Sequence, residues 1–132
     1  MVSTSFPTVS GKTALGAHWA CTLDGEYARR IEDECLVLWN SGITIWLDQY
    51  GNEQNEPMQA RMDVWQADAS ADAQDMKREL DRFSYVLEEE DGILTLNGFV
   101  FSEQGHLLVQ MSMDDAAFLK PARAIFKSIK AV

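Results

Sequence analysis

Two short apolar runs in the first half of the chain predict a β-hairpin. Residues 35–39 and 43–47 are almost entirely apolar and are separated by a three-residue loop that ends in glycine. Such a loop predicts a register in which Trp39 faces Ile43. In that register Trp39 and Trp46 belong to the core on opposite faces of the sheet. Both faces are therefore expected to be covered by other parts of the chain.

Helical spacing of apolar residues appears twice in the middle of the chain and predicts two short helices. Pro57 suits the first turn of one helix, and Asp72 suits the N-cap of the other. The apolar positions that follow are Met58, Met62 and Trp65 in the first helix, and Met76, Leu80 and Phe83 in the second.

After residue 84 the apolar period shortens and predicts a three-stranded meander. The strands are expected at residues 85–89, 93–101 and 106–113, with Asn97-Gly98 forming a bulge inside the second. A wide apolar stripe then predicts a helix over residues 120–130, which should cover one face of the sheet.

The start of the chain has no apolar period. Residues 1–13 are rich in Ser, Thr, Gly and Pro, which predicts a flexible N-terminal arm. A strand is expected over residues 18–23, a turn at Asp24-Gly25, and an approach to the hairpin over residues 27–33. Residues 14–132 then form a single α+β domain: an antiparallel twisted sheet with helices on both faces, that is, an α/β/α sandwich.

Composition narrows the classes of function. Of the 132 residues, 46% are hydrophobic, enough for one sizeable core. The 21 acidic and 11 basic side chains give a formal charge of −10, which argues against binding nucleic acid or an anionic membrane. No apolar run is long enough for a membrane span and no secretory signal is evident, so a cytoplasmic location is expected. The two cysteines, Cys21 and Cys35, are expected to be free thiols.

Catalytic and metal-binding patterns are missing from the sequence. His18 and Cys21 lie three apart in a predicted strand and would point to opposite faces, which disfavours a zinc site with Cys35 or His106. No nucleophile elbow or phosphate-binding glycine loop occurs, and His106 is expected at an exposed turn. The sequence therefore predicts a protein that is not an enzyme and needs no metal or cofactor.

Acidic and amide side chains gather where a protein partner could bind. The loop after the hairpin presents Asp48, Tyr50 and Glu53, and Glu88 and Glu89 belong to a run of like charge at a predicted turn. These five residues are predicted to contact a partner, which would be basic because of charge complementarity. The simpler interpretation is that this acidity only keeps the protein soluble.

The end of the chain carries a resemblance to a known family. The meander ends in Met113-Asp114-Asp115, and the terminal helix reads Ala124-Ile125-Phe126-Lys127-Ser128-Ile129. In these motifs and in element order the chain resembles the PsbP-like superfamily. The resemblance implies an antiparallel sheet between helical layers and a binding or accessory role. Some bacterial relatives are encoded beside secretion systems or neutralise toxins, so we expect an immunity-type inhibitor of a toxin or a secretion-system accessory protein.

Two alternatives stay open at this point. The chain could be a small-molecule-binding protein or an enzyme, with a pocket between the sheet and the two middle helices. Met58, Met62 and Met76 would then give the pocket an adaptable lining. The domain could also be a homodimer whose partner is a second copy of itself.

Overall fold

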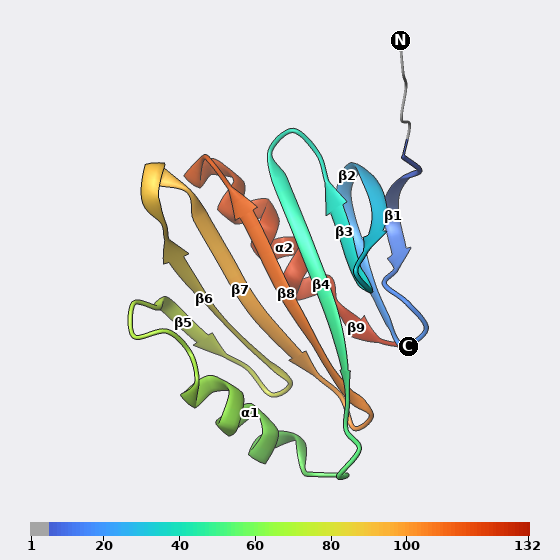
Figure 1. Ribbon diagram of the computed structural model, residues 1–132, viewed down its shortest axis with the longest axis vertical. Helices are drawn as coiled ribbons and strands as arrows, with labels where there is room; N and C mark the ends of the chain where they lie inside the picture. The colour runs from blue at the N-terminus through green and yellow to red at the C-terminus, as the bar shows by residue number, and fades with distance from the viewer. Residues whose placement is uncertain (1–5) are drawn as a thin grey trace.

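The computed structural model describes residues 6–132, which fold around one antiparallel sheet (Figure 1). The strands are β1 (Thr8–Ala14), β2 (Trp19–Glu32), β3 (Cys35–Trp39), β4 (Ile43–Gly51), β5 (Gln74–Arg78), β6 (Arg82–Glu88), β7 (Leu94–Phe101), β8 (Gly105–Met113) and β9 (Lys130–Ala131). The helices are α1 (Met58–Ala67) and α2 (Leu119–Ser128), with the short 3-10 turns η1 (Glu90–Gly92) and η2 (Ala116–Phe118).

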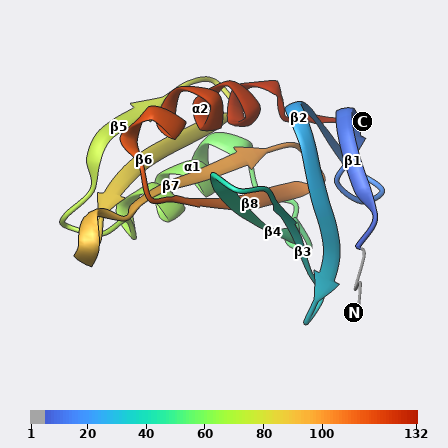
Figure 2. The same ribbon diagram turned by 90° about the horizontal axis from the view of Figure 1, so that it is seen from above.

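The sheet is built from two meanders. Its strand order is β1-β2-β3-β4-β8-β7-β6-β5, and the short β9 pairs with β2 outside this path. Strands β1 to β4 form one meander and β5 to β8 the other, so the two meet only where β4 pairs with β8. Figure 2 shows that the sheet curves, so that β1 and β2 stand at an angle to β6 and β7.

The predicted fold class, an α/β/α sandwich with helices on both faces, is wrong. Strands make up 52% of the described residues and helices only 20%. Helix α2 lies across β2, β7 and β8, whereas α1 lies at one end of the sheet against β6 (Figure 1). The rest of the face that α1 touches has no helical layer in the described chain.

The second middle helix is missing because sheet pairing overrides the local spacing of apolar residues. Its predicted segment instead forms β5 and the start of β6, which pair with each other. Met76 and Leu80 are exposed, and only Phe83 is buried. A helix would have needed all three on one covered face, while the extended pairing needs only Phe83 in the core.

The hairpin of β3 and β4 forms, but its register differs from the predicted one. The structure pairs Trp39 with Thr44 and not with Ile43. The Asn40 side chain accepts hydrogen bonds from the backbone N–H groups of Gly42 and Ile43, at 2.8 and 2.9 Å. The Asn40 N–H in turn donates to the carbonyl of Ile43, at 3.0 Å. Asn40 therefore lies opposite Ile43, and the pairing shifts by one residue.

The shifted register changes the positions of the two tryptophans. Val37 pairs with Trp46, so Trp39 and Trp46 lie on the same face of the sheet and not on opposite faces. Trp46 is an exposed side chain, whereas its neighbours Ile45 and Leu47 are buried on the α2 side. The prediction that both tryptophans belong to the core is therefore wrong: Trp46 is exposed, and Trp39 is half-buried against Phe6, outside both core clusters.

Three smaller predictions also fail. Residues 8–13 of the expected N-terminal arm belong to strand β1 (Thr8–Ala14); residues 1–5 of that arm lie outside the described residues. No turn interrupts β2 at Asp24-Gly25. Asn97-Gly98 pairs regularly with both neighbouring strands and forms no bulge. The meander of β6 to β8, the first middle helix and the terminal helix agree closely with the predicted ranges.

The main core fills the space between the sheet and α2. Ile125 and Ile129 point from the C-terminal segment onto buried residues of β4, β7 and β8. Gly98 in β7 lets the ring of Phe126 lie directly on the strand, because a Cβ there would collide with that ring. The glycine of the predicted bulge therefore serves the packing of α2 on the sheet.

Gly98→Ala is expected to lower the free energy of unfolding by about 1–3 kcal/mol, because the Phe126 ring is buried and must move for the new methyl group. Gly25→Ala is the matched control, since a Cβ on that β2 residue meets nothing within 4 Å. It should leave stability unchanged or raise it by up to about 1 kcal/mol. Urea unfolding of both variants measures the difference; equal effects would contradict the close packing of Phe126 on Gly98.

Candidate functional site

Aromatic side chains cluster at the end of the sheet that α1 covers. Met62 of α1 is fully buried against Phe83, Phe99 and Phe101, which lie on the face opposite α2. The Phe83 and Phe99 rings stack with centroids 4.7 Å apart. This second core is small and separate from the one beneath α2, and a cavity opens beside it.

Strand pairing places three rings side by side at this cavity. His106, near the start of β8, pairs with Tyr50 of β4 on one side and with Phe101 of β7 on the other. The imidazole stacks on both rings, with centroid distances of 4.8 Å to Tyr50 and 5.0 Å to Phe101. Trp65 of α1 adds a fourth ring, 5.0 Å from the imidazole.

Gly105 makes this close approach possible. It pairs with Gly51 where β4 ends and β8 begins. A Cβ on Gly105 would collide with the backbone carbonyl of Tyr50. A glycine here allows β4 and β8 to stay paired to their ends. The pairing in turn fixes the Tyr50 and His106 rings against each other.

His106 is buried without a polar partner. Only 4% of the residue is exposed, and neither ring nitrogen has a hydrogen bond to any of residues 6–132. Burial, with a smaller contribution from the Arg61 charge, lowers the pKa of His106 to about 4. The imidazole is therefore neutral near pH 7 and has one N–H donor and one acceptor nitrogen available.

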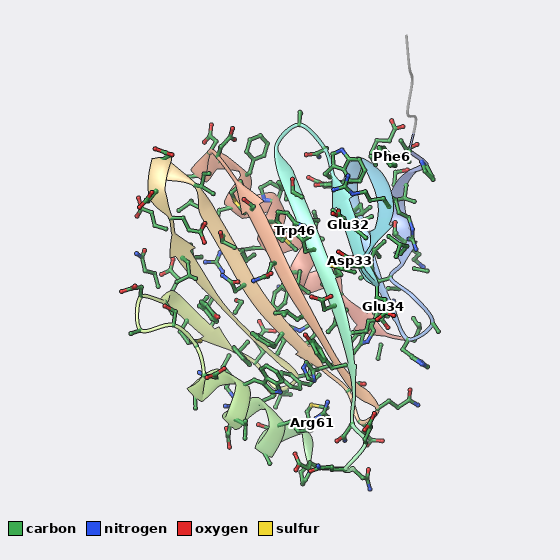
Figure 3. All side chains as sticks on the ribbon, viewed as in Figure 1. Phe6, Glu32, Asp33, Glu34, Trp46 and Arg61 are labelled. Atoms are coloured by element: carbon green, nitrogen blue, oxygen red, sulfur yellow. The ribbon has the colours of Figure 1, made fainter. Side chains whose placement is uncertain are left out.

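Arg61 is the second buried polar group of the site. It projects from α1 (Figure 3), is 5% exposed, and its guanidinium lies 5.3 Å from the centre of the Phe101 ring. Nη1 donates to the carbonyl of Ser102 at 2.6 Å, but Nη2 has no partner and no carboxylate forms an ion pair with Arg61 in the described chain. Burial lowers the pKa of Arg61, while the charge of Glu56 acts in the opposite direction.

A cavity of about 290 Å³ lies between these groups and the loop that follows β4. The loop is held in shape by Asn52, whose side chain bonds to both the N–H and the carbonyl of Glu56 and to the carbonyl of Glu103. The side chains that line the cavity and bear on its chemistry are Tyr50, Glu53, Glu56, Arg61, Trp65 and His106.

The five residues predicted to bind a partner do not form one surface. Tyr50 and Glu53 line the cavity, and Asp48 lies two residues before Tyr50 on β4. Glu88 and Glu89 lie at the other end of the sheet, since Glu88 is the last residue of β6 and aligns through β7 and β8 with the start of β4. Their role in binding a partner stays a prediction.

Arg61 was not predicted to be a site residue, and the predicted position of His106 is wrong. His106 is not at an exposed turn but inside the aromatic cluster. A signal for Arg61 was present: it lies three residues after Met58 and four before Trp65, in the middle of the apolar stripe of α1. A lone charged residue within such a stripe indicates a buried charge.

None of the three methionines predicted to line a pocket lines this cavity. Met62 is buried and Met58 half-buried beside it in the small core, whereas Met76 is exposed on the edge strand β5. Within residues 6–132 no three His, Cys, Asp or Glu side chains gather as a metal-binding group. The candidate ligands are dispersed: Cys21 belongs to the main core, where burial raises the pKa of its thiol to about 11.

No family model and no curated protein matches this sequence. The resemblance to the PsbP-like superfamily therefore stays a prediction. None of the helices in the described chain is long and apolar enough to span a bilayer.

Proposed function

We propose that this chain is a ligand-binding protein and that the cavity beneath α1 receives an anionic group of its ligand. The observation that carries the proposal is the buried guanidinium of Arg61, which has a free Nη2 and no carboxylate partner in the described chain. This cavity differs from the expected pocket between the sheet and two middle helices, because it lies between α1 and the loop that follows β4.

The energetics favour an anion at this position. An unpaired charge held away from water costs several kcal/mol, and a hydrogen-bonded partner of opposite charge offsets much of that cost. Nη2 of Arg61 and the N–H of neutral His106 are both donors without an acceptor among residues 6–132. A carboxylate can accept from both kinds of donor, and arginine binds this group through its planar N–H fork.

The test is a titration of the protein with butyrate, followed by NMR of the Trp65 indole and the His106 ring. Saturable shifts of these signals are expected in the wild type, with affinity reduced at least about tenfold in Arg61→Met, because the charge-assisted hydrogen bond is lost. Arg123→Met is the matched control, since Arg123 lies on α2 and pairs only with Asp75, at 3.6 Å. Equal binding by the Arg61 and Arg123 variants would contradict the proposal.

A second candidate function is the binding of a basic protein, as in an immunity-type inhibitor of a toxin or a secretion-system accessory protein. The turn of the β2–β3 hairpin favours it. Glu32, Asp33 and Glu34 are consecutive there (Figure 3). The exposed Trp46 of β4 lies on the same face of the sheet as Glu32, whereas the exposed Ile31 lies on the opposite face. Electrostatic steering toward such a surface would depend on salt.

Neutralising the hairpin turn tests this second candidate. Asp33→Asn with Glu34→Gln is expected to lower capture of a stoichiometric basic partner several-fold at low salt. Asp72→Asn with Glu79→Gln removes the same charge beside β5, at the opposite edge of the sheet, and should leave capture unchanged. Quantitative mass spectrometry of the captured protein at low and high salt gives the comparison. Equal losses in both variants would mean that net charge, and not the hairpin, attracts the partner.

A further inference from the structure

We infer that the ligand of the cavity beneath α1 is a small zwitterion of the amino-acid class, which carries a cationic group as well as a carboxylate. The inference rests on the proposed function, because it assumes that Arg61 receives the carboxylate. It adds a second subsite, at the mouth of the same cavity, for the positive charge.

Charge at the cavity mouth favours a cation. Glu53 and Glu56 are both exposed and line the outer part of the cavity, while Arg61 and His106 are buried at its inner end. The lining includes two carboxylates, one guanidinium and a neutral imidazole, and no lysine. A ligand with only negative charge would be repelled by the carboxylates on entering, whereas a zwitterion is attracted at both ends.

Aromatic faces reinforce the preference for a cation at the mouth. Tyr50 stacks on His106 through its ring, yet 43% of the residue is exposed, so part of it remains open to a ligand. The half-buried ring of Trp65 lies beside it, with centroids 6.0 Å apart and planes inclined by 41°. Ammonium groups bind to the faces of tryptophan and tyrosine rings, most strongly where carboxylates lie nearby.

The size of the cavity limits the ligand. At about 290 Å³ it is at the small end of the range for small-molecule sites. The buried donors and the acidic, aromatic mouth line one cavity, so one compact molecule can reach both. An amino acid or a close analogue meets this requirement.

Three probes of matched length separate the two charges: 4-aminobutyrate, butyrate and butylammonium. Isothermal titration calorimetry on the intact chain is expected to show 4-aminobutyrate binding about tenfold more tightly than butyrate, with butylammonium weaker than both. The Trp65 indole signal should shift with 4-aminobutyrate beyond its shift with butyrate. If butyrate binds as tightly as 4-aminobutyrate, the zwitterion inference is wrong while the anion site stands. If neither binds, the proposed function fails as well.

Variants at the mouth test the cation subsite directly. Glu53→Gln with Glu56→Gln should abolish the preference for 4-aminobutyrate and leave butyrate affinity equal or higher, since the repulsion is removed. Glu88→Gln with Glu89→Gln is the control, because it changes the same net charge at the far end of the sheet. A preference that persists in the Glu53 and Glu56 variant would overturn the inference, even if the anion still binds.

Discussion

Replacing His106 with phenylalanine is expected to remove a large part of the acid sensitivity of the fold. The pKa of His106 is about 4 in the folded chain and 6.5 in a free side chain. Below pH 6.5 the unfolded chain therefore binds a proton that the folded chain excludes. Above pH 6.5 the free energy of unfolding does not depend on the titration of His106. It falls as the pH drops through the range between 6.5 and about 4, and the total decrease is about 3 kcal/mol.

Urea unfolding between about pH 7.5 and pH 4.5 measures this effect as the difference between wild type and His106→Phe. The phenylalanine ring keeps the stacking on Tyr50 and Phe101, so the variant should be at least as stable as the wild type near pH 7. Tyr50→Phe is the control, because it changes the stacked neighbour and leaves the imidazole in place. Parallel pH curves for wild type and His106→Phe would show that the imidazole is not excluded from protonation.

Arg82→Met is expected to lower the free energy of unfolding by about 3 kcal/mol, although Arg82 is far from the cavity. Its Nη1 donates to the carbonyl of Phe126 and its Nη2 to the carbonyl of Ile129, both at 2.8 Å. These carbonyls belong to the end of α2 and the segment that follows; that of Phe126 also accepts from the N–H of Ile129, at 3.2 Å. Arg82 also pairs with Asp81 and holds the pKa of that carboxyl below its usual value.

Hydrogen exchange separates this capping role from a general loss of charge. Compared with the wild type, Arg82→Met should increase the exchange rate of the amides in the last turn of α2 more than that of the amides in β4 and β8. The reason is that the helix end is released first. Arg82→Lys should recover part of the stability, since a lysine can donate to one of the carbonyls but lacks the planar fork. Asp81→Asn leaves the helix contacts intact and is expected to cost about 1 kcal/mol. A uniform change in exchange across the chain would contradict the local role of Arg82.

Long elements with a sustained period were predicted well from the sequence. The alternation in β6 to β8 and the stripe of α2 are local patterns whose apolar face is buried in the final fold. The predicted second middle helix failed because Met76 and Leu80 have helical spacing but remain exposed, so nothing buries the face they would share. The predicted hairpin register was wrong because Asn40 bonds to Ile43 across the turn through both its side chain and its backbone.

Only part of the candidate site was predicted from the sequence. Tyr50 and Glu53 were named because they follow a rigid strand, and they do line the cavity. Arg61 and His106 depend on contacts between distant parts of the chain: α1 against the turn at Ser102, and β8 against β4. The spacing of residues along the chain predicts neither contact. The position of Arg61 within the apolar stripe of α1 indicates only that its charge is buried.

The joining of two meanders along a single pair of strands has a consequence for the kinetics of folding. Each meander is built from neighbouring strands and can form through short loops, whereas β4 and β8 are brought together only when the whole segment between them has closed into a loop. Contacts of such high sequence separation slow folding. The last strand, β9, then returns to β2 and links the end of the second meander to the first. We therefore expect formation of the central β4–β8 pair to limit the folding rate of the sheet.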